Sequence, residues 1–261
     1  MKILEGKRGV KMLSKYNINF LVKDDYDKQV DCISTSQIIK APREAALSIC
    51  FKSDTRDPIS MWKLAIGSAV HKYREDQENT KILWAEKRFF MDIDGMKLTG
   101  KPDLVDFDYN QPAVPTDDGQ IIIEDLKVSS VWTYKAGEFE NYKLQLSIGR
   151  LLVNDFFEAN RTQSRLSDVG VITFIAIDWD NGKKKYMDEP IKEIPLKLIP
   201  LDETYDIVKK RMVEIYRYVD MIQKGKASKV PMCLDEYREK YSKKKCTHYC
   251  SVCKTCQKLR G

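Results

Sequence analysis

The chain has 261 residues, of which 43% are hydrophobic and 32% charged, and this length suits one large domain or one domain with a small appendage. The longest apolar run, residues 169–177, is too short to span a membrane, and residues 1–9 lack the apolar stretch of a signal peptide, so we expect a cytoplasmic protein. The formal net charge of +6 does not by itself indicate nucleic-acid binding, although lysine-rich clusters at 183–185 and 240–260 are of the kind that follows a phosphate backbone.

The spacing of apolar residues and the turn signals predict alternating helices and strands. In chain order we expect helices at 34–51 and 57–77, a hairpin of strands at 81–91 and 96–108 around Asp94-Gly95, a loop at 110–120, a strand at 121–128, a helix at 133–159, strands at 169–178 and 184–194, and a helix at 202–224. This order predicts an α/β fold in which a mixed sheet is flanked by helices on both faces. We expect one domain over 1–230 and a basic, cysteine-rich tail over 231–261.

Two carboxylates and a lysine are the strongest candidates for catalysis. Residues 100–103 read Gly-Lys-Pro-Asp, and residues 124–127 read Glu-Asp-Leu-Lys at the end of a predicted strand. Because side chains two apart share one face of a strand, Asp125 lies beside Lys127, whereas Glu124 lies on the opposite face. Asp103 is expected on the neighbouring hairpin strand, from where it can approach Asp125. Two such carboxylates repel each other unless a divalent ion lies between them, and that ion would polarise a phosphate and activate water.

The charge that develops during such a reaction would be offset by Lys127. Taken alone, Asp-x-Lys also fits an ordinary charge cluster at a strand end, so the interpretation depends on the preceding Gly-x-Pro-Asp.

Two further pairs of candidates lie on predicted helices. His71 and Glu75 are four residues apart and share a helix face, so His71 could ligate a metal ion while Glu75 holds its second ring nitrogen. Tyr142 and Gln145 lie on the helix after the Asp-x-Lys strand, where they could contact a scissile phosphate or an unstacked base. A structural histidine and a polar helix face are the alternative interpretations of these pairs.

The C-terminal segment contains four closely spaced thiols, at Cys246, Cys250, Cys253 and Cys256. Their spacing fits one metal ion better than a disulfide framework, with His248 as a substitute for one thiol. Zinc is favoured over a 4Fe–4S cluster because all four ligands are local, although Cys32 or Cys50 could supply a ligand from beside the first helix. Reduced cysteines in a basic tail are the alternative, and Cys233 is expected to be an ordinary buried thiol.

Taken together, these motifs resemble the PD-(D/E)XK nuclease superfamily, specifically its RecB-like exonuclease branch, which includes the CRISPR adaptation nucleases with a cysteine-bound cluster. The matching residues, within about 34–150, are Gly67, His71, Glu75, Glu86, Gly-Lys-Pro-Asp at 100–103, Asp-Leu-Lys at 125–127 and Gln145. The resemblance implies a restriction-endonuclease-like sheet that binds Mg²⁺ or Mn²⁺ through His71, Asp103, Asp125 and the carbonyl of Leu126. It also implies that Lys127 orients or activates the attacking water, that Gln145 contacts substrate, and that Glu86 is an acid of the preceding strand.

Two positions depart from the family pattern. Position 149 is glycine, whereas the family's glutamine motif usually has a tyrosine there that contacts the substrate strand. The cluster-bearing members have a cysteine before Pro-Arg in the first helix, whereas this chain has Ala41. The substrate contact and the long-range cluster ligand therefore cannot be carried over from the family.

The resemblance implies a Mg²⁺-dependent deoxyribonuclease, an exonuclease that acts on DNA ends or single strands in recombination, repair or phage DNA processing. Its partners would be DNA and a recombination or replication protein, with no membrane, and a viral origin would fit by resemblance only. A non-catalytic DNA-binding or assembly subunit on a nuclease scaffold, and a structure-specific endonuclease, are the alternatives.

Overall fold

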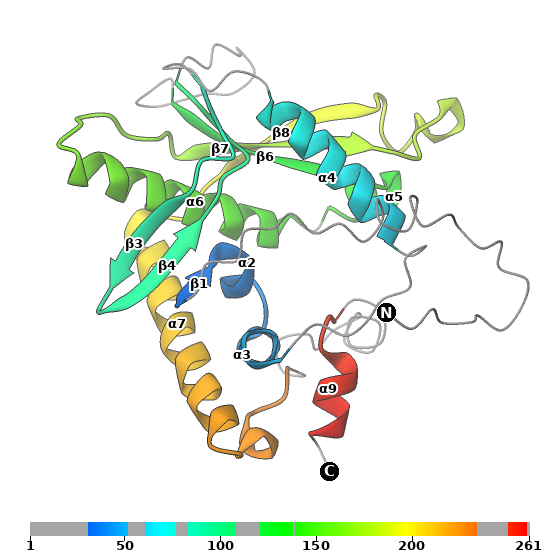
Figure 1. Cartoon of the computed structure of the whole chain (residues 1–261). Helices are drawn as coiled ribbons and strands as arrows, with labels where there is room; N and C mark the ends of the chain where they lie inside the picture. The colour runs from blue at the N-terminus through cyan, green and yellow to red at the C-terminus, as the bar shows by residue number, and fades with distance from the viewer. Residues whose placement is uncertain are drawn as a thin grey trace, which may run out of the picture.

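The computed structural model describes residues 31–51, 61–76, 83–107, 121–137, 139–233 and 250–259, which form two mixed sheets flanked by helices (Figure 1). The strands are β1 (Cys32–Ser34), β2 (Leu83–Ala85), β3 (Phe89–Ile93), β4 (Met96–Gly100), β5 (Leu104–Asp106), β6 (Ile122–Ser129), β7 (Val169–Ala176) and β8 (Ile191–Lys197). The helices are α2 (Thr35–Ile38), α3 (Pro42–Cys50), α4 (Trp62–Glu75), α5 (Val131–Ala136), α6 (Glu140–Ala159), α7 (Leu201–Gln223) and α9 (Cys253–Lys258), with short 3₁₀ turns η2 (Asn181–Lys183) and η3 (Ala227–Lys229). The expected α/β class is confirmed, with two sheets in place of one.

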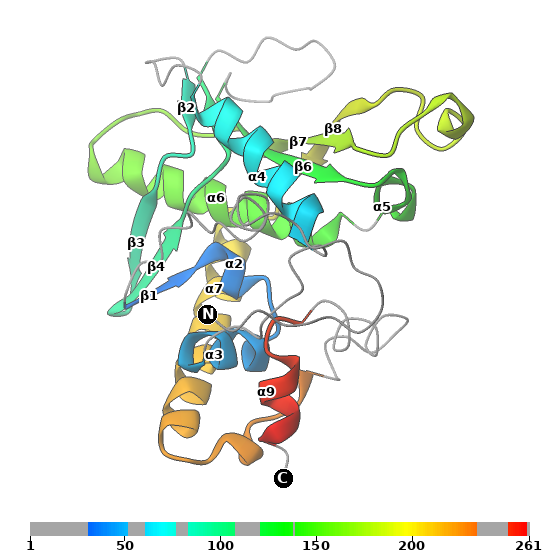
Figure 2. The same cartoon turned by 45° about the vertical axis from the view of Figure 1, so that its right-hand side comes forward.

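The larger sheet has the strand order β2-β5-β6-β7-β8, in which β6 and β7 are parallel and the other pairs antiparallel. Helices α4 and α6 pack on opposite faces of the central strand β6 (Figures 1 and 2). Gly67 of α4 lies against Val128, and Gly149 of α6 lies against Ile123. Because alternate side chains of β6 point to opposite faces, each of its two rows of side chains faces a different helix.

The predicted hairpin is confirmed, but both of its arms change sheet. Strands β3 and β4 turn at Asp94 and Gly95, whose φ angles of 53° and 78° fit a two-residue hairpin turn, and both belong to the three-stranded sheet β1-β4-β3. Their continuations β2 and β5 belong to the five-stranded sheet. The chain crosses between sheets at Glu86, whose φ is 52°, and again at Pro102-Asp103, where the N of Glu86 donates to the O of Asp103 at 3.1 Å.

This crossing corrects the expected position of Asp103. The sequence predicts one continuous strand at 96–108, whereas β4 ends at Gly100 and β5 begins at Leu104. Pro102 has no N–H group with which to continue the ladder of β4, so the chain is free to turn into the other sheet. Asp103 consequently lies at the crossing point and not within the hairpin strand.

Two of the predicted helices are each divided in two. The helix expected at 34–51 forms α2 and α3, because Pro42 lacks an amide hydrogen and disfavours helical geometry at the residue before it. The helix expected at 133–159 forms α5 and α6, because Gly137 adopts a left-handed conformation with φ 66° and ends α5.

The strand expected at 184–194 lies instead at Ile191–Lys197. Asp180 accepts a hydrogen bond from the N of Gly182 and begins the turn η2, and Lys183 donates to the carbonyl of Asp178, so this segment is a compact turn. Lys183 also forms ion pairs with Asp178 and Asp180, so one charge of the predicted basic run is neutralised locally. The predicted loop at 110–120 lies outside the described residues.

A second apolar cluster joins α9 to α3 and α7. Its buried members are Ala46, Leu47, Tyr218, Ile222, Ala227, Val230, Val252 and Cys256. Arg43 of α3 is buried at the centre of this region and donates to the carbonyl oxygens of Ala227 and Val230. Both views show α3 between α7 and α9 (Figures 1 and 2). None of the helices in the described ranges is long and apolar enough to cross a membrane.

The close approach of α6 to β6 should make Gly149 intolerant of a side chain. A Cβ at position 149 would lie 2.4 Å from Ile123 Cδ1, so Gly149→Ala should lower the free energy of unfolding by about 1–2 kcal/mol despite the better helix propensity of alanine. Chemical denaturation measures this change. The additional substitution Ile123→Val, which removes Cδ1, should restore part of the loss.

A second helical glycine provides the control. At Gly67 the nearest described atom to a new Cβ is Val128 Cβ at 4.0 Å, an ordinary contact, so Gly67→Ala should raise the free energy of unfolding by about 0.5–1 kcal/mol. Equal effects of the two substitutions would contradict this account of how α6 packs.

Candidate active site

Asp103 and Asp125 face each other across the pairing of β5 with β6. The two strands are antiparallel with Leu104 opposite Glu124, and the same register places Asp103 opposite Asp125. The Oδ2 atom of Asp103 accepts a hydrogen bond from the N of Leu126 at 2.7 Å, which fixes this carboxyl group directly before β5. The structure therefore brings together the two acids that the sequence analysis paired.

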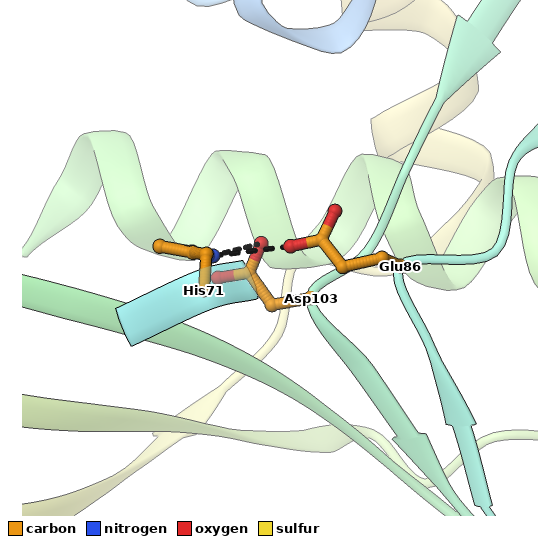
Figure 3. Close-up of side chains that lie close together, drawn as sticks. All are labelled: His71, Glu86 and Asp103. Carbon is orange, nitrogen blue, oxygen red and sulfur yellow. Dashed lines mark hydrogen bonds and ion pairs between the residues drawn. The ribbon is translucent and has the colours of Figure 1, made fainter. Parts of the chain in front are cut away.

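His71 and Glu86 complete one side of the site. His71 lies in α4, Glu86 follows β2, and Asp103 precedes β5, and their side chains point toward one another (Figure 3). The Nδ1 atom of His71 lies 3.1 Å from Glu86 Oε1 and 3.7 Å from Asp103 Oδ1. Lys101 Nζ lies 3.0 Å from Glu86 Oε2. Glu86, which the resemblance treats as an acid of the preceding strand, is thus a direct neighbour of His71.

Asp125, Lys127 and Gln145 form the other side. Lys127 Nζ lies 2.6 Å from Asp125 Oδ2, and Gln145 Nε2 donates to Asp125 Oδ1 at 2.6 Å. Lys127 Nζ also donates to Gln145 Oε1 at 3.4 Å and lies 5.1 Å from the ring centre of Tyr142. Gln145 and Tyr142 lie in α6, so this helix positions the acid and the lysine of β6. Whether either residue also contacts a substrate stays a prediction.

Glu124 lies on the opposite face of β6, as strand geometry predicts. Its Oε1 atom lies 3.0 Å from Arg74 Nη1 and accepts a hydrogen bond from Thr173 Oγ1. Arg74 lies in α4 and Thr173 in β7, so Glu124 attaches the helix that carries His71 to the sheet. This role makes Glu124 structural and separates it from the site of Asp125.

The charges of the site are strongly coupled. Burial, followed by the negative charge of Asp125, raises the pKa of Asp103 to about 7. Burial also raises the pKa of Asp125 by more than neighbouring Lys127 lowers it. Burial alone would lower the pKa of Lys127, but Asp125 and Asp103 attract its charged form and raise that pKa. The hydrogen bond to Glu86 raises the pKa of His71. Lys127 is therefore a cation that stays protonated.

The donor groups fit a hard divalent cation. His71, Glu86 and Asp103 each offer one ligand atom within 4.8 Å of the others. Asp125 Oδ2 is buried, and among the described residues the Lys127 ammonium, 2.6 Å away, is the group that compensates its charge. A buried oxygen of this kind and an acid with a raised pKa are both stabilised by a cation.

Glu75 and Leu126 are two predicted site residues whose predicted roles the structure leaves untested. The side chain of Glu75 lies outside the described part of the chain, whereas Glu86 occupies the position beside His71 that was predicted for Glu75. Leu126 contributes its N–H group to Asp103, and a role for its carbonyl as a ligand stays a prediction. Lys101 had no predicted role, although it lies within Gly-Lys-Pro-Asp. Its place two residues before Asp103 in the sequence is the signal that could have placed Lys101 near the acids.

Gly149 is explained by packing. A Cβ at this position would meet Ile123 Cδ1 at 2.4 Å and Pro102 Cγ at 3.6 Å, so a tyrosine would not fit without movement of α6. Glycine at position 149, where the resemblance would imply a tyrosine, therefore accompanies a close contact between α6 and the Gly-Lys-Pro-Asp segment.

The described C-terminal thiols lie against α3. Cys253 and Cys256 belong to α9, Cys250 packs against the same apolar cluster as Cys50, and Arg43 Nε donates to Cys256 Sγ at 3.3 Å. Cys246 and His248 lie outside the described residues. Ala41, at the position of the family's cysteine, is buried two residues before Arg43.

Cys233 differs from the expected buried thiol because it is only partly buried and lies near other thiols. Burial raises its pKa to about 12, and Glu44, Cys256 and Cys250 are near enough to contribute. Four cysteines from three parts of the chain, Cys50, Cys233, Cys250 and Cys256, therefore lie around the region where α3 meets α9.

Comparison with known proteins assigns no family. No protein-family model matches the chain, and no curated protein matches its sequence. Among solved structures, the chain is similar to one described as "Crystal structure of SSO0001", with a TM-score of 0.46 and 14% sequence identity over 76% of this chain and 82% of that chain. A similarity of this size assigns neither a family nor a function.

The raised pKa of Asp103 should make the stability of the protein depend on pH when divalent ions are removed by a chelator. The acid titrates at about 7 in the folded chain and near 3.8 when exposed, so the free energy of unfolding should fall as the pH rises from about 4 to about 7. Asp103→Asn removes this effect and should raise the free energy of unfolding by more than about 1 kcal/mol at pH 8, but little at pH 4.

Thermal unfolding at several pH values measures the difference. Asp188→Asn serves as the control, because the hydrogen bond to Lys192 lowers the pKa of this exposed acid, and its replacement should not stabilise the protein at pH 8. An effect of Asp103→Asn that is equal at pH 4 and pH 8 would contradict the electrostatic account.

Proposed function

We propose that the protein is a Mg²⁺- or Mn²⁺-dependent deoxyribonuclease with a restriction-endonuclease-like fold, and that it acts as an exonuclease on DNA ends or single strands. The observation that carries the proposal is the pair formed by Asp125, which is buried in β6, and Asp103, which is partly buried and lies opposite it directly before β5, with Lys127 beside Asp125. Two acids and a histidine can hold a divalent ion, and a protonated lysine beside them can stabilise the negative charge that develops when a phosphodiester is hydrolysed.

Each residue of the site would have a separate role in binding the ion or positioning its ligands. His71, Asp103 and Asp125 would hold the divalent ion. Glu86 would join them, because its carboxylate, His71 and Asp103 offer ligand atoms within 4.8 Å of one another. The ion would supply a Lewis acid for the phosphate and lower the pKa of a bound water. Gln145 and Lys127 hold the two oxygens of Asp125, so they position this acid.

Lys127 would act as a cation and not as a base. Its pKa is raised, because the attraction of Asp125 and Asp103 outweighs the effect of burial, so it keeps its proton at neutral pH. A fixed ammonium group next to the metal ligands can orient the attacking water and stabilise the negative charge that develops on the phosphate.

Replacement of Asp125 tests the proposal directly. Asp125→Asn should lower Mg²⁺-stimulated cleavage of DNA by at least about 100-fold, because loss of a ligand exceeds the 10–100-fold effects of residues that only support ligands. End-labelled linear DNA and circular DNA, incubated with and without Mg²⁺, give the rate and also distinguish an exonuclease from an endonuclease by their products.

Glu124→Gln is the matched control. This neighbouring acid lies on the opposite face of β6 and binds Arg74 and Thr173, so its replacement should lower stability but leave cleavage by the folded protein within a few-fold of wild type. Equal digestion by wild type and Asp125→Asn would contradict the proposed site. DNA binding without metal-stimulated cleavage would favour a non-catalytic scaffold.

We further propose that the C-terminal thiols bind a structural metal ion, with zinc favoured. Cys253 begins α9, Cys250 lies three residues before it and Cys256 three residues after it. The sulfur atoms of these three described residues do not lie within 4.8 Å of one another, so an ion would have to draw them together, and it would then fix α9 against α3. The fourth ligand would be Cys246, or His248 in its place.

Metal analysis of the purified protein checks this proposal. We expect about one zinc per chain, a large loss of zinc in Cys256→Ser, and unchanged zinc in Cys32→Ser, because Cys32 lies in β1 and not in the cluster of α3, α7 and α9. Iron with inorganic sulfide in place of zinc would identify a 4Fe–4S cluster. Absence of both metals from protein that was purified without chelators under anaerobic conditions would contradict a metal site.

A further inference from the structure

An exposed tryptophan and a partly buried tyrosine lie side by side just beyond the carboxyl end of β6. Trp132 of α5 and Tyr186, in the segment between β7 and β8, have ring centres 4.9 Å apart. Trp132 is 51% exposed, although tryptophan is among the side chains that proteins usually bury. In both views α5 directly follows the end of β6, the strand that carries Asp125 and Lys127 (Figures 1 and 2).

Lysines surround the two rings. Lys135 Nζ lies 4.3 Å from the ring centre of Tyr186 and 5.4 Å from that of Trp132, and Lys185 Nζ lies 4.9 Å from the ring centre of Tyr186. Both lysines are exposed, and so is Lys184. In the described ranges, no ion pair involves any of these three lysines, whereas the nearby Lys183 is paired with Asp178 and Asp180. The surface therefore combines an open ring face with uncompensated positive charge.

The fold does not need the exposed face of Trp132. Helix α5 is held in place by its first residue, Val131, which is buried and whose N donates to Asp178 Oδ1 at 2.8 Å. The segment that carries Tyr186 is held by Trp179, whose Nε1 donates to the O of Met187 at 2.8 Å. These contacts keep both aromatic residues in place, so the outer ring face of Trp132 is available in a rigid, preformed position.

We propose that Trp132 and Tyr186 form a stacking platform for unpaired bases of a single DNA strand, with Lys135 and Lys185 contacting its phosphates. Every base presents a flat ring face, and aromatic side chains next to a cationic groove bind single strands with little sequence preference. A DNA duplex hides these faces within its stack, so it cannot use the platform in the same way. The lysines favour a polyanion over an apolar protein segment as the occupant.

The position of the platform fits a strand that continues into the candidate active site. Lys127 and the end of β6 at Ser129 are about 7 Å apart along the strand, and α5 begins two residues later. A bound strand would thus pass from the platform to the acids within a few nucleotides. The statement that the bound strand is also the substrate rests on the proposed nuclease function. Binding of the strand to the platform does not depend on cleavage.

Binding of a labelled oligothymidylate of about 15 nucleotides to the full chain, without added Mg²⁺ or Mn²⁺ so that the strand is not cleaved, tests the platform. Wild type should bind the single strand more tightly than a duplex of equal length, and the single strand should quench tryptophan fluorescence. Trp132→Ala and Tyr186→Ala should each weaken binding by roughly 5- to 100-fold, and Trp132→Ala should remove most of the quenching. Lys135→Ala should weaken the dependence of binding on salt concentration.

Phe90→Ala provides the matched control. Phe90 has the same exposed fraction as Trp132, 51%, but lies in β3 of the three-stranded sheet. It should bind the oligonucleotide as wild type does. Wild-type affinity in Trp132→Ala, an equal loss in Phe90→Ala, or equal binding of duplex and single strand would each overturn the platform. Because the assay measures binding without added Mg²⁺ or Mn²⁺, weaker binding by Trp132→Ala supports the platform even if the protein cleaves no DNA. Cleavage that requires Asp125, together with normal binding by Trp132→Ala, would overturn the platform alone.

Discussion

Two carboxyl groups held in one buried place are the constraint on which this site depends. Two ionised carboxylates that lie close together away from water repel each other by several kcal/mol. Two features of the structure reduce this repulsion. The pKa of Asp103 is raised to about 7, so this acid keeps its proton below that pH, and the charge of Asp125 is compensated by Lys127 and Gln145. A bound divalent cation would also reduce the repulsion, and it alone would let both acids ionise at neutral pH. An arrangement that is unfavourable without a cation is what a catalytic metal site requires.

The arrangement arises from the way one hairpin is shared between two sheets. Both arms of the hairpin leave the three-stranded sheet and enter the five-stranded sheet, and the crossing points are held together by the hydrogen bond from Glu86 to Asp103. Each crossing places one acid where the ladder is interrupted, so its side chain is not committed to sheet packing. Helix α4 then adds His71 from one face of β6, while α6 supports Asp125 and Lys127 from the other face. Four elements distant in sequence thus contribute to a single site.

Local chemistry in the sequence was sufficient to predict part of this arrangement. The alternation of side chains along a strand correctly separated Asp125 and Lys127 from Glu124, and the Asp94-Gly95 pair correctly predicted the hairpin turn. The breaks at Pro42 and Gly137 also have local causes, which the apolar periodicity of the longer predicted helices concealed. The neighbour of His71 was beyond such reasoning, because Glu86 reaches it through a change of sheet that depends on pairings between distant strands. The contact of Trp132 with Tyr186 was hidden for the same reason.

The most direct test is the location of a bound ion. Crystals of the protein grown or soaked with Mn²⁺ and measured at a wavelength that gives anomalous scattering from manganese would show it. The account predicts an anomalous peak within about 2.0–2.6 Å of an oxygen of Asp103, with His71 and an oxygen of Asp125 among the other ligands. A peak that contacts none of these three side chains, or no peak in this site at a saturating concentration of Mn²⁺, would contradict the account.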